Sequence, residues 1–419
     1  MHRHVALSFA SATYNAAQET RPRGPVHLIV TCALAIIALP AVGACLYLSV
    51  LTLLSAKLRA PAKSDRRMRF DVIVPAHNEV EVLSRVLTTL AALDWPEDKR
   101  EIIVVADNCT DDTAALARRL GATVMERRDP ERRGKGYALD FAFQSSRARR
   151  FADAVVVVDA DAEVSPNLLE AIAARMERGA QAVQVHYGVS NASASWRTRL
   201  LTIAKASFHI VRSRARERLG LSCGIRGNGW AVTHRTLAAV PYRAFSLTED
   251  LEYGIELGLA GFRVHYAEEA SSNAEMASGE RAARKQRQRW ERGRFQLIRS
   301  RTLTLLGQAV RRRSWVCLDL ALDLMVLPLS YVVLNAALLT GVALVAGAWE
   351  GFQGSWSLLA AFCWVALIAY ILRGWQLSGV GARGLIDLAR APLYLVWKIL
   401  IMSSRREATE WVRTKREES

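Results

Sequence analysis

The feature that most limits how this chain can fold is a run without a single charged residue over 27–54. About 20 consecutive apolar residues are enough to cross the hydrocarbon layer of a bilayer, so the run predicts a transmembrane helix over 26–54. A cleaved signal peptide is the alternative, but the run is too long for one and follows a polar segment over 1–25. We therefore expect the chain to be anchored in a membrane.

Two further apolar stretches predict transmembrane helices over 315–349 and 356–372. Lysines and arginines are more frequent directly after the first apolar run than before it, and three arginines precede the second. Positive charge marks the cytoplasmic side of membrane segments, so the charged middle of the chain is expected in the cytoplasm. The chain is then a multi-pass protein of the inner (plasma) membrane.

A last apolar stretch, over 382–403, contains charged residues and a proline. This composition predicts an interfacial amphipathic helix, followed by a cytoplasmic tail over 404–419. The net charge of +16 would also suit a nucleic-acid-binding protein, but zinc-ligand spacing and an aromatic–basic RNA-binding pattern are missing. Many arginines flank the apolar stretches, so we expect membrane lipids, and no nucleic acid, as partners. The six cysteines show no paired spacing and predict no disulfide framework.

Short β-branched runs alternate with helical patterns in the first part of the charged region. The runs predict strands at 70–75, 102–105, 122–126 and 154–158. Such alternation indicates an α/β domain with a mostly parallel central sheet, which we place at 70–300. Ligands of these sheets bind beyond the carboxyl ends of the strands.

Carboxylates follow two of these strands. Asp107 comes after the second predicted strand, and Asp159 and Asp161 come after the fourth. Mg²⁺ and Mn²⁺ are commonly held by one or two carboxylates, with substrate phosphate oxygens completing the coordination. The pair therefore suits a divalent metal site, although an Asp-x-Asp pair in a surface turn is the alternative.

The tripeptide Thr248-Glu249-Asp250 precedes a second helical pattern. One interpretation is a helix cap, in which Thr248 or Ser246 accepts amide hydrogen bonds and the acids favour the positive end of the dipole. The other is a general base, which needs a carboxylate on a rigid element. Both interpretations stay open at this point.

A basic helical pattern contains Gln286, Arg289 and Trp290. A solvated or lipid-facing basic helix would account for it. A diphosphate, however, is well bound by a guanidinium, which contacts two phosphate oxygens at once. The tryptophan adds an apolar face on which a sugar ring can lie, so the pattern also suits a site for both groups.

In this order, Asp107, Asp159-x-Asp161, Thr248-Glu249-Asp250 and Gln286-x-x-Arg289-Trp290 resemble the motifs of membrane-anchored inverting family 2 glycosyltransferases, a group that includes cellulose, chitin and hyaluronan synthases. The resemblance covers about residues 70–300. It implies a Rossmann-like, nucleotide-sugar-binding domain of the glycosyltransferase A type, flanked by transmembrane helices. It also implies a hexosyltransferase that uses Mg²⁺ or Mn²⁺ and moves a sugar from a nucleotide diphosphate sugar to a growing glycan. The new linkage would be β, and the product would be a polysaccharide or exopolysaccharide. Transfer of a single sugar to a lipid acceptor and a non-catalytic membrane scaffold are the alternatives.

The resemblance further implies a role for each matching residue. The donor would contact Pro75, Ala76, Glu79, Asp107, Lys135, Asp159 and Arg289. A metal ion would bind Asp161 and Asp159, and Asp250 would be the catalytic base, supported by Glu249. The acceptor would contact Trp290, Gln286, Cys223 and Gly224. The segment 221–229 lacks the usual aromatic residues before Cys223, which leaves the identity of the acceptor open.

Asp319 and Asp323 stand four residues apart, on one face of a predicted helix. They could line a path for the product, or form ion pairs with Arg311–Arg313 and the basic helix near the interface. Three crossings can hardly enclose a path for a hydroxyl-rich polymer, because unsatisfied polar groups are costly in hydrocarbon. We expect either a short or lipid-linked product passed to a separate export protein, or a homo-oligomer that builds the path.

Overall fold

The computed structural model describes residues 25–276, 280–350 and 355–392. The predicted polar segment before Pro25 and the tail over 404–419 lie outside this range. The chain divides into two compact units, which are described separately. One comprises Met1–Leu46 and Leu329–Leu367, and the other Tyr47–Pro328 and Ile368–Ser419.

Three of the described helices are long and apolar enough to cross a membrane. They are α2 (Pro25–Leu53), α13 (Leu329–Glu350) and α14 (Ser355–Ser378). The single helix predicted over 315–349 is divided, because α12 (Trp315–Met325) ends before Pro328 and α13 begins after it. A proline disfavours helical backbone at the preceding residue, which explains the break. The span is therefore shorter than the sequence suggested, and α12 belongs to the other unit.

The larger unit contains an eight-stranded sheet in the order β3-β2-β1-β4-β7-β6-β8-β5. Its strands are β1 (Phe70–Ala76), β2 (Arg100–Asp107), β3 (Thr123–Arg127), β4 (Ala154–Val157), β5 (Ala162–Val164), β6 (Ala182–Val189), β7 (Trp230–Thr233) and β8 (Val264–Ala274). Parallel pairing joins β3, β2, β1 and β4, and also β6 with β8. Strand β7 lies antiparallel between β4 and β6, and β5 is antiparallel to β8. The predicted α/β fold with a mostly parallel sheet is confirmed.

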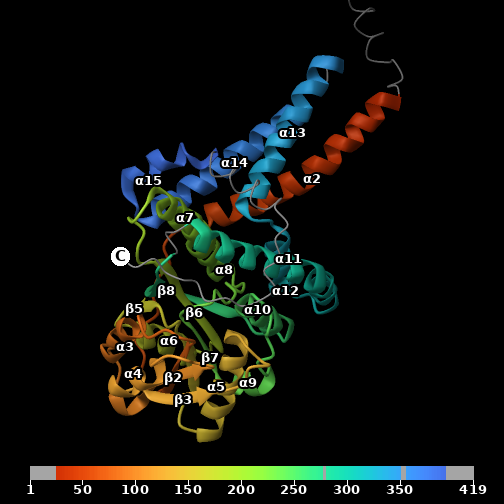
Figure 1. Cartoon of the computed structure of the whole chain (residues 1–419). Coiled ribbons are helices and arrows are strands. Elements are labelled where there is room, and N and C mark those ends of the chain that lie inside the picture. The colour runs from red at the N-terminus through yellow and green to blue at the C-terminus, as the bar shows by residue number, and fades with distance from the viewer. Residues whose placement is uncertain (1–24, 277–279, 351–354, 393–419) are drawn as a thin grey trace, which may run out of the picture. The chain divides into compact units, whose positions relative to one another are not determined.

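Helices connect the strands (Figure 1). They are α3 (Leu83–Ala91), η1 (Glu97–Lys99), α4 (Thr113–Arg119), α5 (Lys135–Arg149), α6 (Leu168–Met176), α7 (Trp196–Ala206), the π-helix η2 (Ser207–Val211), α8 (Arg212–Arg218), α9 (His234–Ala239) and α10 (Glu249–Leu259). Two further helices, α11 (Glu280–Arg311) and α15 (Gly381–Leu388), come after the last strand. The predicted interfacial helix over 382–403 is represented by α15, since residues after 392 lie outside the described part. Its Asp387 is buried and pairs with Arg199 of α7 at 2.6 Å.

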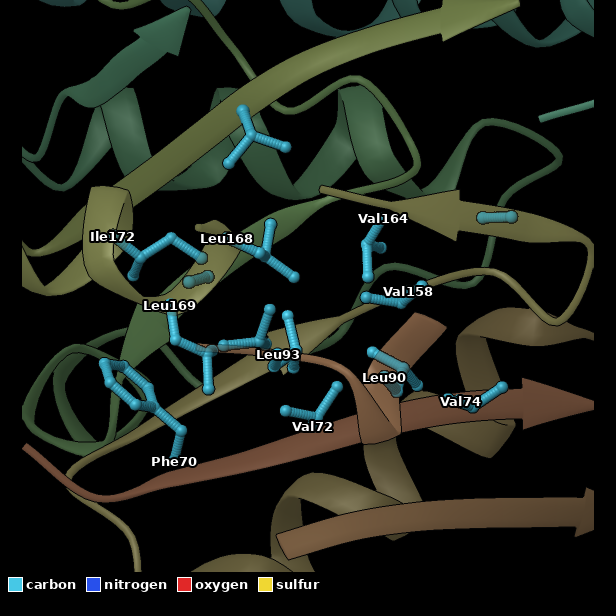
Figure 2. Packing of buried hydrophobic residues seen from close by; sticks show 14 of the residues in the cluster. Phe70, Val72, Val74, Leu90, Leu93, Val158, Val164, Leu168, Leu169 and Ile172 are labelled. Atoms are coloured by element: carbon cyan, nitrogen blue, oxygen red, sulfur yellow. The ribbon is translucent and has the colours of Figure 1, made fainter. Parts of the chain in front are cut away.

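Both faces of the sheet are covered, because successive side chains of a strand point to opposite faces. Phe70, Val72 and Val74 of β1 pack with helices α3 and α6 in one core cluster, part of which Figure 2 shows. Ile73 of the same strand packs with α5 and α10 in a second cluster. Burying one such aliphatic side chain fully contributes about 1.5–3 kcal/mol. These two layers hold the carboxyl ends of the central strands in fixed positions.

Helices α10, α11 and α12 form a third cluster, which includes Ile255, Leu297 and Leu320. Two glycines allow the helices to approach closely. A Cβ at Gly293 of α11 would lie 2.5 Å from Thr248 Cγ2, and one at Gly258 of α10 would lie 2.3 Å from Leu320 Cδ1. The basic helix α11 is therefore fixed against the start of α10.

Candidate active site

The carboxyl ends of adjacent strands carry the first group of predicted residues. Pro75 and Ala76 end β1, and Asp107 ends β2. Asp107 Oδ1 lies 2.6 Å from Nη1 of Arg127, its register partner on β3, and accepts a hydrogen bond from Asn108 at 3.1 Å. Sequence reasoning missed Arg127, although the end of the neighbouring strand is where a partner for Asp107 would be expected.

Lys135 connects residues from three separate segments. Its Nζ lies 2.5 Å from Asp159 Oδ1 and 3.6 Å from Glu249 Oε1, and donates a hydrogen bond to the carbonyl oxygen of Gly227 at 2.7 Å. Burial disfavours the charged form of Lys135, but Asp159 and Glu249 outweigh this and raise its pKa above the ordinary value. We call Lys135, Asp159, Glu249 and Asp250 the carboxylate site. A predicted donor-binding residue and the two predicted catalytic residues thus lie around one ammonium group.

Glu249 and Asp250 are the first two residues of α10. Burial raises the pKa of Glu249 to about 7, although Lys135 opposes the rise. Burial also raises the pKa of Asp250, again against the effect of Lys135. A carboxylate with a raised pKa is a stronger base, so the site favours proton abstraction near neutral pH.

The loop before β7 leaves room for the Asp250 carboxylate, because it has a glycine at position 227. Gly227 has a φ of +92°, and a Cβ at this position would lie 3.1 Å from Asp250 Oδ2. The loop is fixed by Gln184, which accepts a hydrogen bond from the Arg226 amide at 2.8 Å and donates one to the Asn228 carbonyl at 2.7 Å. Asn228 in turn accepts a hydrogen bond from the Asp159 amide at 3.1 Å. One loop therefore positions both ends of the carboxylate site.

Asp161 precedes β5 and lies near two buried side chains of other elements. Burial raises the pKa of Tyr187 well above its usual range, and Asp159, Asp161 and Asp250 add to the rise while Arg289 opposes it. Burial lowers the pKa of Lys205 to about 7, with Asp161 and Asp159 opposing. The charges of three predicted carboxylates and of Arg289 thus all affect the pKa of Tyr187. These four predicted site residues therefore lie near one another.

The described residues contain no cluster of three or more metal-ligating side chains. Asp159 and Asp161 nevertheless fit a divalent ion, because both offer hard oxygen atoms just after β4. Mg²⁺ or Mn²⁺ commonly takes only one or two carboxylates and completes its shell with phosphate and water. The donor set is suitable for a metal that arrives with a diphosphate.

The predicted residues of α11 are half-buried. Arg289 Nε is buried and has no hydrogen-bond partner among the described residues, so it is available to a ligand. Gln286 and Trp290 lie on the same helix, which Gly293 fixes against Thr248. The ligand-binding roles of these residues stay predictions.

The acceptor roles of Cys223 and Gly224 stay predictions. The Cys223 side chain is fully buried in the second core cluster, and burial raises its pKa to about 12. Gly224 supplies a turn with a φ of +74° beside it.

Thr248 makes no cap hydrogen bond, and the Ser246 amide instead donates to Glu252 Oε2 at 3.1 Å. Glu79 donates its amide to Thr113 Oγ1 at 2.9 Å, which fixes the loop after β1.

Aromatic residues at the edge of the site had no signal in the sequence. Tyr137 of α5 stacks on Phe245 with ring centroids 4.4 Å apart, and the Arg127 guanidinium lies 5.8 Å from the Tyr137 ring. The stack is formed by residues more than a hundred positions apart, so only the fold brings them together. It connects the Asp107 end of the site with the loop that precedes α10.

Comparison with known proteins gives consistent matches. A beta-monoglucosyldiacylglycerol synthase of Nostoc sp. is 27% identical over 265 residues, which cover 61% of this chain and 56% of that protein. A probable glucomannan 4-beta-mannosyltransferase of Arabidopsis thaliana is 25% identical over 246 residues, covering 56% and 44%. A solved mannosyltransferase of Pyrobaculum calidifontis, in complex with GDP-Man and Mn²⁺, has 20% identity and a TM-score of 0.49, covering 82% of this chain and 98% of that one.

The chain spans about half the length of the curated relatives it matches. The family model described as glycosyltransferase like family 2 matches residues 68–293, which is more than half of the chain. These residues contain the whole sheet and every residue of the carboxylate site. The chain therefore belongs to glycosyltransferase family 2.

Proposed function

We propose that this chain transfers a sugar from a nucleotide diphosphate sugar to a hydroxyl group of a lipid acceptor and forms a β linkage. The observation that carries the proposal is the carboxylate site, in which Lys135 connects a donor-side carboxylate with the start of α10. The names of relatives that are beta-monoglucosyldiacylglycerol synthases support a lipid acceptor. The three membrane-length helices would keep the enzyme beside such an acceptor.

In the proposed reaction Asp250 takes the proton of the acceptor hydroxyl. The acceptor oxygen then forms a bond to the anomeric carbon, and the bond from this carbon to the donor diphosphate breaks. One displacement of this kind inverts the configuration, so an α-linked donor gives a β-linked product. Arg289 would stabilise the charge of the departing nucleoside diphosphate, because its Nε, which has no partner in the described part of the chain, can donate to a phosphate oxygen.

Asp159 and Asp161 would hold Mg²⁺ or Mn²⁺, which neutralises diphosphate charge when bound. Lys135 keeps the Asp159 carboxylate oriented at 2.5 Å. Arg127 and Asp107, together with the stacked Tyr137 and Phe245, would form the part of the site that receives the nucleoside. Trp290 and Gln286 would lie on the acceptor side.

Growth of a polysaccharide is the second candidate, as in the cellulose, chitin and hyaluronan synthases that the motifs resemble. The similarity to glucomannan mannosyltransferases favours it. In either case the active domain would lie on the cytoplasmic side of the plasma membrane. A short or lipid-linked product would need a separate export protein, and a long polymer would need a homo-oligomer.

The proposal is tested with the purified chain, a panel of nucleotide sugars and micelles that contain diacylglycerol, with and without Mn²⁺. Product mass and the NMR coupling of the anomeric proton report the sugar count and the linkage. We expect one β-linked sugar on the lipid. An α-linked product would contradict the single displacement, and a long polymer would favour the second candidate. Inactivity with every donor, despite intact nucleotide binding, would favour the membrane scaffold.

A further inference from the structure

Three arginine side chains gather beside a single aromatic ring in the larger unit, and a fourth shares a carboxylate with one of them. The guanidinium carbons of Arg226, Arg212 and Arg294 lie 4.2, 4.8 and 5.8 Å from the centre of the Phe208 ring. Arg216 belongs to the same group through a shared carboxylate. We call Arg212, Arg216, Arg226 and Arg294 the arginine cluster.

Two carboxylates of α12 neutralise part of this cluster. Asp323 Oδ1 lies 2.6 Å from Arg212 Nη1 and 2.8 Å from Arg216 Nη2, and Asp319 Oδ2 lies 3.0 Å from Arg216 Nε. The expected partners, Arg311–Arg313 and the basic helix, are thus replaced by arginines of α8. Arg294 of the basic helix donates to the Val326 carbonyl at 3.0 Å, and its charge also acts on Asp323. Four guanidinium groups face two carboxylates, so the cluster carries surplus positive charge.

Arg226 forms no ion pair among the described residues, although the charge of Asp323 acts on it and opposes the lowering of its pKa. Its side chain is 6% exposed, and its Nε and Nη2 atoms are buried without a hydrogen-bond partner among the described residues. The backbone amide, in contrast, is satisfied by Gln184. Burial lowers the pKa of Arg226, but a guanidinium stays charged in proteins. A buried charge without a partner is strongly unfavourable, which indicates a site that an anion completes.

The position of Arg226 relates this site to the acceptor. Arg226 directly precedes Gly227, whose carbonyl accepts the hydrogen bond of Lys135 and at which an added Cβ would lie 3.1 Å from Asp250 Oδ2. Within the larger unit, Tyr370 accepts a hydrogen bond from Arg212 at 2.9 Å, and Tyr47 donates one at 2.8 Å to Asp319, a partner of Arg216. A group bound at Arg226 would therefore lie next to the loop that positions the catalytic base.

We propose that the arginine cluster is an anion subsite at which Arg226 binds the phosphate group of an acceptor lipid whose hydroxyl lies at Asp250. Phosphate suits the site because a guanidinium can offer it two parallel N–H groups. The inference rests on the proposed sugar transfer, and it narrows the acceptor to lipids that carry both a phosphate and a free hydroxyl. Free phosphate has the same chemistry, so the test includes it.

The first experiment compares phosphatidylglycerol with diacylglycerol as acceptor in micelles of a nonionic, sugar-free detergent. The readout is the ratio of the two kcat/KM values. We expect wild type to prefer phosphatidylglycerol, and Arg226→Gln to lower the ratio at least about tenfold, as for a lost hydrogen bond to a charged group. Arg226→Lys should be intermediate. Arg235→Gln, an exposed position on α9, is the control and should keep the wild-type ratio. An unchanged ratio in Arg226→Gln would overturn the proposal.

The second experiment measures thermal unfolding with inorganic phosphate or chloride at equal ionic strength. Phosphate should raise the Tm of wild type and of Arg235→Gln more than that of Arg226→Gln. A phosphate effect that depends on Arg226, combined with no preference between the two lipids, would assign the site to free phosphate and overturn the acceptor role. Equal phosphate effects in all variants would overturn the anion site itself. If no acceptor is used at all, the proposed function fails, and the unfolding experiment still decides whether the anion site exists.

Discussion

The carboxylate site and the arginine cluster both bury charged groups, but the sign of the surplus charge differs between them. In the carboxylate site one ammonium group, Lys135, lies among Asp159, Glu249 and the neighbouring Asp250. In the arginine cluster four guanidinium groups face two carboxylates. The first region has surplus negative charge and suits a cation and a proton, whereas the second suits an anion. A single loop, at residues 221–229, passes from one region to the other.

The comparison teaches that the surplus charge of each region predicts what it binds. Ion pairs that are fully matched need no ligand and mainly stabilise the fold. Glu217 and Arg263, for instance, pair at 2.9 Å. The following four experiments test whether the two regions differ as their charges suggest.

The largest effect is expected from Arg216→Met. The change leaves Asp319 without its arginine partner and Asp323 with one partner fewer, and breaking a buried pair costs about 3–5 kcal/mol. The Tm, followed by fluorescence in detergent, should fall strongly. Arg235→Met on the surface of α9 is the matched control and should change stability by less than about 0.5 kcal/mol. Similar Tm values for both variants would show that the arginine cluster does not stabilise the fold.

In the carboxylate site, Asp250→Asn should reduce catalysis rather than stability. Loss of a general base lowers kcat by about a hundredfold or more, because no group remains to take the acceptor proton. Nucleoside diphosphate affinity, measured by calorimetry, should stay within about a factor of three, since the donor is bound elsewhere in the site. Glu256→Gln on the same helix is the control. A variant that keeps a tenth of wild-type activity would identify another base.

Gly227→Ala tests the loop that the two regions share. A methyl group at this position would lie 3.1 Å from Asp250 Oδ2, and a displaced catalytic group can lower the rate by about tenfold to a hundredfold. Gly179→Ala separates this effect from backbone strain, because Gly179 has a similar φ of +95° with nothing within 4 Å. Both variants should lose about 1–3 kcal/mol of stability, but only Gly227→Ala should lose activity. Equal activities would contradict the proposed contact.

The smallest effect is a shift in the pH profile. The pKa of Glu249 is raised to about 7 and that of Asp250 is also raised, so kcat/KM should rise with pH as the pair loses its protons. In Glu249→Gln one negative charge beside Asp250 is removed, so the acid limb should move to lower pH. Lys135 and Asp159 face the same pair and remain in place. An acid limb that moves to higher pH would contradict the assigned coupling.

The sequence predicted the first strands well because their signals are local. The runs at 70–75 and 154–158 are β-branched and buried, and the structure contains β1 and β4 there. The division at Pro328 was missed, since the continuous apolar character of 315–349 concealed it. The arginine cluster was also missed. The sequence of α8 has the composition of an ordinary basic helix, and only the fold shows its ion pairs with α12.

The candidate site likewise contains some residues that the sequence could predict and others that it could not. Asp159, Asp161, Glu249, Asp250 and Arg289 carry recognisable motifs, and the electrostatic environment of Tyr187 relates four of them to one another. Arg127, Arg226 and the Tyr137–Phe245 stack depend on contacts between distant segments. Cys223 stood next to a motif glycine, but only the burial of its thiol shows that it packs in the core.

The order of strands in the sheet has a consequence for synthesis of the protein on the ribosome. Strand β8 pairs with both β6 and β5, but it is translated after both of them. Until residues 264–274 emerge, β6 presents an unpaired edge, and such edges are prone to join other chains. The first membrane helix emerges much earlier and would hold the unfinished domain at the bilayer. Premature termination between β7 and β8 would therefore leave a membrane-bound fragment with an open edge, which quality-control proteases would have to remove.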